Sequence, residues 1–209
     1  MKKLYFLLVV LMGFWSVSGQ NIVFTDMNLK NMLVNSSPFS NIPVASDIND
    51  QPTAIDINND GEIQVSEALL IYKLNFFATG FTNLTGIEMF TNLKYFSVLD
   101  YTLSSIDISN NLNLKNLSIA CPSLLTLNLG NVELVNLSVN NSSLLSLDLS
   151  NTSTLKHLSV QDAPISAIDL SNQTLLLSFT ASNLPITYLD FSNNLALTNI
   201  TVQYTTLNP

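Results

Sequence analysis

The same spacing of apolar residues occurs six times in the second half of the chain. The pattern L-x-x-L-x-L-x-x-x-x-L begins at Leu93, Leu114, Leu134, Leu155, Leu176 and Leu197, so successive copies follow one another at a nearly constant step. In one copy the apolar positions are Leu155, Leu158, Val160 and Ile165. Self-similarity at a fixed period of this length is typical of a solenoid, in which each coil buries its apolar side chains against its neighbours. The repeat therefore constrains the fold more than any other feature of the sequence.

Two stretches in each copy alternate between apolar and polar residues. Phe96 and Val98 flank Ser97, and residues 106–108 repeat the alternation as Ile-Asp-Ile. A period of two is typical of β-strands, whose successive side chains point to opposite sides. Nothing between the two stretches has the period of a helix. The sequence therefore predicts a repeat solenoid of about 21-residue coils, with short parallel strands on both faces.

Each coil also has to turn, and small polar residues or glycine mark one of its turns. We expect these turns at Asn110, Gly130, Asn151, Asn172 and Asn193. Only one step of the repeat is shorter than the others, and it separates the copies that begin at 114 and 134. One residue is missing there between Leu129 and Leu134, so we expect the Gly130 turn to absorb the deletion.

These motifs resemble a known family of repeats. The first motif of each coil, L-x-x-L-x-L-x-x-x-x-L, resembles the leucine-rich repeat. The second motif, Ser146-Leu-Asp-Leu-Ser-Asn151 and its equivalents, resembles short repeats of secreted proteins from Bacteroidetes-type bacteria, which are related to internalin-like repeats. The resemblance covers roughly residues 84–209 and implies a leucine-rich-repeat solenoid. The chain departs from the family pattern where Asn is usual, which weakens the expected asparagine ladder on that turn; the residues there are Tyr101, Pro122, Ser142, Ala163, Leu184 and Thr205.

The first nineteen residues have the composition of a targeting segment. Met1-Lys-Lys3 is basic, residues 4–17 are mostly apolar, and small residues precede Gln20. The apolar run is shorter than a membrane span requires, which favours a cleaved secretory signal over a membrane anchor. We therefore expect a bacterial protein that is secreted or held at the cell surface, with no membrane insertion after signal removal.

Composition excludes several classes of function. The chain has no Arg and a formal net charge of -8, which argues against nucleic-acid binding. Its only cysteine, Cys121, cannot form an internal disulfide and is expected to be a small residue at a strand end and not a nucleophile. His157 is the only histidine, and the chain has no nucleophile elbow or glycine-rich phosphate loop. We therefore predict that the protein is not an enzyme.

Residues 20–83 are expected to form a small helical cap at the N-terminal end of the solenoid, which occupies residues 84–209. Asp26 is a favourable helix N-cap residue, and Leu29 and Leu33 give the following turns one apolar face. The cap should cover the otherwise open end of the first coil.

The rest of the cap divides into a loop and a second helix. Residues 38–54 contain Pro38, Pro43 and Pro52 and few periodic apolar residues, so we expect a loop. Apolar residues then recur from Ala68 to Phe77 with a helix-like spacing, so a second helix is expected there.

Between these segments, residues 56–67 match the calcium loop of an EF-hand. The segment Asp56-Ile-Asn-Asn-Asp-Gly-Glu-Ile-Gln-Val-Ser-Glu67 fits D-x-[DN]-x-[DN]-G-x5-E at every required position. Calcium takes six to eight oxygen ligands, and this spacing supplies them from five side chains and one backbone carbonyl. The predicted ligands are Asp56, Asn58, Asp60, Glu62 through its carbonyl, Gln64 and Glu67.

The segment resembles half an EF-hand, as in dockerin-like loops, because Pro52 argues against an entering helix. We expect bound Ca²⁺ to fix the cap to the first coil. The alternative is an acidic turn that holds no ion.

Stacked coils place outward side chains in columns, and the columns of the first face are almost all hydroxyls and amides. Such a face is suited to an extended partner, either a protein or an extracellular glycan. The predicted partner-binding residues are Tyr95, Ser97, Asn116, Ser118, Asn136, Ser138, His157, Ser159, Gln161, Asn199, Thr201 and Gln203. The opposite face presents a column with Asp107, Asp148, Asp169 and Asp190, which we interpret as a solvated edge and not as a second ion site.

The sequence therefore predicts an exported recognition or adhesion module. The alternative is a structural spacer in a larger surface protein with no ligand of its own. The sequence stops partway round the sixth coil, and solenoids normally cap such an end, so we also expect that the natural chain continues past Pro209.

Overall fold

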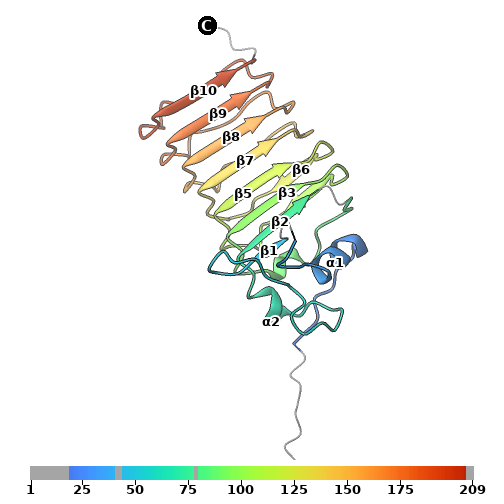
Figure 1. The fold of residues 1–209 in the computed structure, drawn as a ribbon. Coiled ribbons are helices and arrows are strands. Elements are labelled where there is room, and N and C mark those ends of the chain that lie inside the picture. Colours follow the sequence, from blue (N-terminus) through green and yellow to red (C-terminus); the bar gives the residue numbers. More distant parts are fainter. Residues whose placement is uncertain (1–18, 41–43, 78–79, 206–209) are drawn as a thin grey trace, which may run out of the picture.

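Parallel strands stack along one face of the molecule and set its elongated shape (Figure 1). The computed structural model describes residues 19–40, 44–77 and 80–205. Within these ranges the main sheet has the order β1-β2-β3-β5-β7-β8-β9-β10, with β1 antiparallel to β2 and every other pair parallel. The strands are β1 Ala45–Ser46, β2 Lys73–Phe77, β3 Tyr95–Leu99, β5 Asn116–Ala120, β7 Asn136–Asn140, β8 His157–Gln161, β9 Ser178–Ser182 and β10 Asn199–Gln203.

The register of this sheet confirms the predicted repeat solenoid. Phe96 of β3 pairs with Leu117, Leu117 pairs with Leu137, and Leu137 pairs with Leu158. Equivalent apolar residues of successive coils therefore stack in buried columns, and the polar residues between them face outward. The buried side chains form one continuous core from the cap into the coils.

The predicted signal peptide, residues 1–19, lies outside the described residues except for Gly19, so it stays a prediction. In the ranges that the structure does describe, no helix is long and apolar enough to cross a bilayer.

The second face of the solenoid forms strands in its first two coils only. β4 (Ser105–Asp107) pairs with β6 (Thr126–Asn128), and the Asn128 amide donates to the Asp107 carboxylate at 3.0 Å. The predicted strands on this face do not continue beyond β6, because residues 146–148, 167–169 and 188–190 are not strands. Each of these three segments ends in Asp, and like charges stacked on neighbouring strands repel one another, whereas the first two coils pair Asp with Asn.

The segment predicted as a second helix is mostly a strand. α2 covers only Val65–Ala68, and β2 follows it and pairs in parallel with β3. Leu74 and Phe76 are buried, whereas Lys73 and Asn75 alternate with them on the outer side. This segment forms a strand and not a helix because its backbone hydrogen-bonds to β3 along its whole length. Phe76 also packs edge-on against Phe96, with ring centroids 5.2 Å apart. The sheet thus begins before residue 84, in the segment assigned to the cap.

The first helix forms as predicted. α1 spans Met27–Val34, and the Asp26 carboxylate accepts the N–H of Leu29 at 2.9 Å, which is the expected N-cap bond. The same carboxylate also accepts the N–H of Thr82 at 2.6 Å, so it ties α1 to the segment that leads into the first coil. A single 3₁₀ turn, η1 (Ile87–Met89), follows in that segment. Figure 1 shows α1 and α2 together at the β1 end of the sheet.

Buried polar side chains support the turns after the second face, and the sequence analysis missed them. Asn111 donates through Nδ2 to the Ile87 carbonyl at 2.9 Å, and Asn194 donates to the Gln173 carbonyl at 2.8 Å. Gln173 in turn donates to the Leu149 carbonyl at 2.7 Å. Each bond joins a coil to the one before it, so a ladder of amides exists on this turn and not on the turn where the family pattern places it.

The turn at Gly130 absorbs the shorter coil, as expected. Asn116 pairs with Asn136 in the sheet, so the two coils stay in register although one residue is missing between them. Gly130 has φ 55, and a Cβ at this position would lie 2.5 Å from the Cβ of Ser109. The shortened turn therefore presses the backbone so close to the preceding coil that only glycine fits.

The last described coil has an exposed inner side. Ile200 pairs with the buried Phe179 of β9, yet the Ile200 residue is 54% exposed. Leu207, the last apolar position of this repeat, lies outside the described residues. The expectation that further coils follow stays a prediction.

Candidate functional sites: an acidic loop and a polar strand face

The backbone of the acidic loop wraps around the Asp56 side chain. The Asp56 carboxylate accepts the N–H of Asp60 at 3.2 Å and the N–H of Gly61 at 3.0 Å. Gly61 has φ 80, a left-handed conformation that glycine adopts without strain. The loop therefore makes the sharp turn that the motif predicted at this glycine.

Glu67 closes the loop from α2. Its Oε1 accepts the N–H of Ile57 at 2.8 Å, and its Oε2 accepts the N–H of Gln64 at 2.9 Å. The first and last residues of the motif are buried, since Asp56 is 5% exposed and Glu67 is 6% exposed. Neither carboxylate forms an ion pair within the described part of the chain. Two buried negative charges are thus compensated only by backbone N–H groups.

The other predicted side-chain ligands meet at Asp60. Asn58 donates through Nδ2 to Asp60 Oδ2 at 3.0 Å, and Gln64 donates through Nε2 to the same oxygen at 2.9 Å. The N–H of Glu62 donates to Asp60 Oδ1 at 2.9 Å, and this bond holds the pKa of Asp60 below its usual range. Asp60 is therefore an anion that two rotatable amides already approach.

The Glu62 side chain is engaged by a lysine. It forms an ion pair with Lys30 of α1 at 2.5 Å, which agrees with a role for Glu62 through its carbonyl alone. Two backbone bonds also attach the loop to the start of the described chain, from Ile22 N–H to the Ile63 carbonyl at 2.8 Å and from Val65 N–H to the Gln20 carbonyl at 3.0 Å. The loop is therefore held between α1 and the N-terminal segment.

The donor set of the loop suits a hard cation. Three carboxylates and two amide oxygens belong to one short loop, and such oxygen ligands are those that calcium prefers. In the described ranges, however, no three Asp, Glu, His or Cys side chains already gather as a metal cluster. Two of the five predicted side-chain ligands, Asn58 and Gln64, are amides and not carboxylates. Both present N–H groups to Asp60 and not their oxygens. Turning each amide over would present its oxygen instead.

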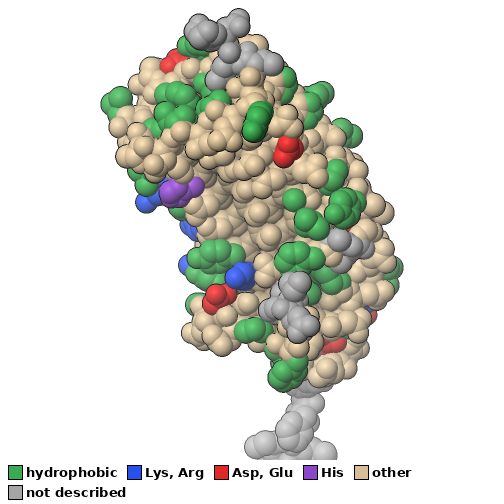
Figure 2. Space-filling model, turned by 45° about the horizontal axis from the view of Figure 1, so that its top comes forward, with side chains coloured by type: hydrophobic (Ala, Val, Ile, Leu, Met, Phe, Trp, Pro, Cys, Tyr) green, Lys and Arg blue, Asp and Glu red, His purple; other side chains and the backbone are tan. Residues whose placement is uncertain are grey.

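The columns predicted as a partner-binding surface do lie side by side on the main sheet. A groove of about 330 Å³ runs along them. Eight of the predicted residues line it, namely Tyr95, Ser97, Asn116, Ser118, Asn136, Ser138, His157 and Ser159. The other four predicted residues, Gln161, Asn199, Thr201 and Gln203, belong to β8 and β10 but are not part of this lining. Figure 2 shows the surface hollowed across the middle of the molecule, where most side chains are neither charged nor hydrophobic.

The lining also contains residues that were not among the predicted ones: Ser178 and Thr180 of β9, the apolar Phe96, Leu117, Leu137 and Leu158, and two residues of β2. Lys73 and Asn75 extend the same columns onto β2, where Lys73 pairs with Tyr95 and Asn75 pairs with Ser97. They were missed because the segment around them was assigned to a helix. The alternation of polar and apolar residues over 73–77 was the signal that could have placed them.

Hydrogen bonds between neighbouring side chains hold this face in a fixed arrangement. The Asn136 amide donates to the Asn116 side-chain oxygen, and His157 Nδ1 lies 2.7 Å from Ser178 Oγ. Gln161 donates to Ser159 Oγ at 3.0 Å. Side-chain bonds therefore order part of this polar face.

Two further sequence predictions can be placed in the structure. Cys121 is buried, and burial raises the pKa of its thiol to about 11, which fits a structural residue and not a nucleophile. Asp148, Asp169 and Asp190 are exposed on the second face, and each accepts the N–H of the serine two residues later. This column has the features of the solvated edge that we expected.

Comparison with known proteins gives fold-level similarity only. No family model and no curated protein matches the chain. Among solved structures, the chain is similar to internalin C2 from Listeria monocytogenes, with 17% identity, a TM-score of 0.47 and coverage of 90% of this chain and 88% of that one.

Two more Listeria monocytogenes structures show the same kind of similarity. The functional domain of InlJ has 20% identity and a TM-score of 0.41, and the alignment covers 90% of this chain and 49% of that one. Internalin InlF has 18% identity and a TM-score of 0.34, with coverage of 88% and 70%. The chain thus spans about half the length of the InlJ domain. Similarity at this level carries no inference about a partner.

Proposed function

We propose that this protein is an exported recognition or adhesion module that binds an extended protein or glycan through its strand face. The observation that supports this most directly is the groove of about 330 Å³ along the polar columns of β3, β5, β7 and β8. An ordered row of hydroxyls and amides can hydrogen-bond a long partner at many points. The rival function is a structural spacer, which needs the solenoid but no groove.

We also propose that Ca²⁺ stabilises the cap. Asp56, Asp60 and Glu67 would bind the ion with carboxylate oxygens, Asn58 and Gln64 with amide oxygens, and Glu62 with its carbonyl. The ion would neutralise the buried charges of Asp56 and Glu67, which have no lysine partner in the described chain. Because the loop is bonded to α1 and to residues 20–22, its order would extend to the whole cap.

Binding to immobilised polysaccharides and extracellular proteins tests the recognition function. We expect retention on at least one of these partners, and loss of that retention when Tyr95, His157 and Gln161 are all replaced by alanine. The matched control replaces Asp148, Asp169 and Asp190 of the second face by asparagine and should bind like the wild type. Thermal melts of both variants should stay near that of the wild type. A spacer would be retained on none of these partners.

Calorimetric titration of calcium tests the cap proposal. We expect one site with a dissociation constant of roughly 10⁻⁶ to 10⁻³ M. Thermal melts should shift to a lower temperature in chelator, because an ion that binds only the folded state stabilises it. No heat of binding and no shift would mean that the loop is an acidic turn without an ion.

A further inference from the structure

Three lysines occupy the same position on different coils, immediately before the strands of the main face. Backbone bonds place them in one ladder: Lys115 N–H donates to the Lys94 carbonyl at 3.0 Å, and Lys156 is joined to Lys115 through Val135, by bonds of 2.8 and 2.9 Å. Neighbouring strands lie about 4.8 Å apart, so the three positions span about 15 Å of the solenoid. We call Lys94, Lys115 and Lys156 the lysine ladder.

The basic charges of the solenoid are gathered on one edge. The lysine ladder contains every basic residue other than histidine between residues 84 and 209. The aspartates of the second repeat motif, Asp107, Asp148, Asp169 and Asp190, occupy one column on the opposite face instead. The three lysines are not part of the groove lining, but they directly precede Tyr95, Asn116 and His157, which are, so a protein with a formal net charge of -8 has a basic edge beside its groove. Figure 2 shows lysine side chains along one edge of the hollow.

The ammonium groups of this edge are accessible to a ligand. Lys156 is exposed and lies next to His157, which lines the groove. Lys115 Nζ donates to the Glu133 carboxylate and to the Glu133 carbonyl, both at 3.1 Å. The Glu133 side chain is largely exposed, and such a surface pair is weak enough for an anionic ligand to compete with it. Lys94 Nζ lies 5.0 Å from the centre of the Tyr72 ring, which holds it near the groove end occupied by Tyr95. Lys73, which pairs with the exposed Asp50 at 3.3 Å, adds a fourth cation in the lining itself.

We propose that the partner of the strand face is an anionic polysaccharide that runs across the strands. Its carboxylate or sulfate groups would meet the lysine ladder, and its hydroxyls would meet the columns of Asn116 and Ser118. This inference rests on the proposed recognition function and specifies the chemistry of its partner. The charge of the edge selects an anion, and the polar columns beside it select a chain rich in hydroxyl groups.

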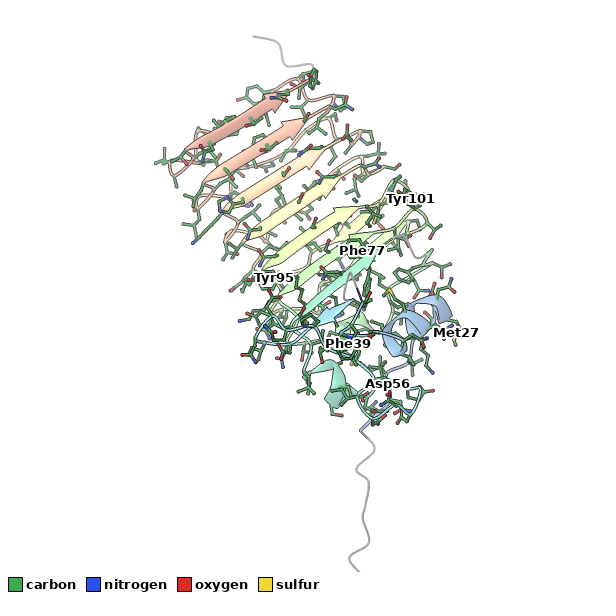
Figure 3. The ribbon with its side chains drawn as sticks, in the orientation of Figure 1. Met27, Phe39, Asp56, Phe77, Tyr95 and Tyr101 are labelled. Atoms are coloured by element: carbon green, nitrogen blue, oxygen red, sulfur yellow. The ribbon has the colours of Figure 1, made fainter. Side chains whose placement is uncertain are left out.

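An acidic peptide fits the same edge less well. Protein interfaces draw most of their binding energy from aromatic and apolar anchors in desolvated pockets. The outward columns beside the lysine ladder offer hydroxyls and amides, with Tyr95 as the one large ring beside His157. The apolar residues of the lining, Phe96, Leu117, Leu137 and Leu158, lie beneath these columns and are buried, so they offer no open pocket to an apolar anchor. The exposed Phe77 and Tyr101 lie toward the other end of the strands, as Figure 3 shows. The strands of the ladder are also paired on both sides, so a peptide could not add to the sheet through its backbone.

Binding to matched pairs of polymers tests this proposal. We would measure the full chain, with calcium present, on polygalacturonate and its neutral methyl ester, on dextran sulfate and neutral dextran, and on poly-glutamate. We expect binding to polygalacturonate or to dextran sulfate, which separates a carboxylated from a sulfated partner, and none to the two neutral polymers. Poly-glutamate should bind at least about tenfold more weakly, because it offers charge without hydroxyls.

The variant Lys94→Gln/Lys115→Gln/Lys156→Gln should lose at least about tenfold in affinity and should show a shallower salt dependence, since fewer counterions are released. The control Asp148→Asn/Asp169→Asn/Asp190→Asn changes the net charge by the same magnitude in the opposite direction. It should bind within about twofold of the wild type, because its charges lie on the far face, about a Debye length or more away. Melting curves establish that both variants are folded.

Several outcomes would overturn the proposal. Equal binding of the neutral polymers, or unchanged affinity of the lysine variant, would show that the ladder does not select an anion. Equal binding of poly-glutamate would show that the partner is an acidic polypeptide. If none of the anionic polymers binds but another partner is lost with the Tyr95, His157 and Gln161 variant, this inference fails and the recognition function stands. If no partner binds at all, both fail.

Discussion

The carboxylate of Asp100, directly after β3, accepts the backbone N–H of Phe81 at 3.0 Å. The same side chain accepts N–H groups from Gly80 at 2.8 Å, Thr102 at 2.7 Å and Leu103 at 2.9 Å. One buried side chain thus joins the segment after β2 to the turn after β3, at the junction of the cap and the first coil. The repeat pattern does not predict these bonds, because Asp162 is the only Asp at the equivalent position of a later coil, and it is exposed.

Replacing Asp100 by alanine should destabilise the protein severely. The change leaves four backbone N–H groups without their acceptor, and each unsatisfied buried donor costs about 1–3 kcal/mol. We expect a loss of at least about 3 kcal/mol in the free energy of unfolding, measured by urea denaturation. Asp148→Ala removes an exposed carboxylate that accepts one serine N–H and should cost within about 1 kcal/mol. Similar losses for the two variants would contradict the anchoring role of Asp100.

Replacing Gly130 by alanine should cost more than a left-handed backbone alone explains. A Cβ at Gly130 would lie 2.5 Å from Ser109 Cβ, whereas a Cβ at Gly80, which has φ 70, would meet nothing within 4 Å. Gly80→Ala should therefore cost about 1 kcal/mol, the usual penalty for a left-handed alanine, and Gly130→Ala about 1–3 kcal/mol more. Thermal melts of the two variants measure the difference. Equal shifts would mean that the shortened turn has room to relax.

Replacing Glu67 by glutamine should abolish the calcium response, whereas Glu62→Gln should retain it. Glu67 would supply two carboxylate oxygens to the ion, but Glu62 would supply only its carbonyl, which the substitution leaves in place. The readout is the change in melting temperature between calcium and chelator for each variant. The Glu62 variant also loses its ion pair with Lys30, so a lower melting temperature with an intact calcium response is the expected control result. An unchanged response in the Glu67 variant would exclude it as a ligand.

Stability should fall in acid through the buried aspartates. Burial raises the pKa of Asp100, but hydrogen bonds from Phe81, Thr102 and Leu103 outweigh this and lower it below the usual value. Burial also raises the pKa of Asp26, and bonds from Thr82 and Leu29 outweigh it in the same way. A pKa that is lower in the folded state gives stability above the unfolded value of about 3.9, and this stability is lost as pH falls through the folded value.

Urea denaturation at pH values between about 6 and 2.5 checks this dependence. The wild type should be nearly constant above about pH 5 and should lose stability below about pH 4. Asp100→Asn should start lower and lose less over the same range, because one titrating group is gone. A wild-type protein whose stability did not change across this range would contradict the assignment.

The repeat could be predicted because each coil gives the same information again. A single apolar residue such as Val98 does not specify a strand, but its equivalents Ile119, Val139 and Val160 fix both the period and the inward side. The acidic loop could be predicted for a different reason. Its backbone geometry follows from local bonds between Asp56, Gly61 and Glu67, which the motif already specifies.

The features that could not be predicted depend on contacts between segments, and the sequence does not show which segments are neighbours. Residues 68–77 have apolar side chains at both helical and strand spacings, and only the ladder with β3 decides for the strand. The end of the second-face strands likewise depends on which polar residues stack on neighbouring coils. The constant position of the three lysines in the repeat is visible in the sequence, but their proposed role in binding an anion could be inferred only once the structure had located the groove.

The second face beyond β6 has no backbone hydrogen bonds between coils among the described residues, whereas the strand face is bonded throughout. The solenoid is therefore mechanically asymmetric. Its strand face resists stretching along the axis, because every coil-to-coil step would break a ladder of bonds. Its other face beyond β6 is held between coils by side-chain bonds, such as those from Gln173 to the Leu149 carbonyl and from Asn194 to the Leu170 carbonyl. Bending about the strand face would therefore strain only these side-chain bonds, whereas stretching the strand face would break backbone ladders.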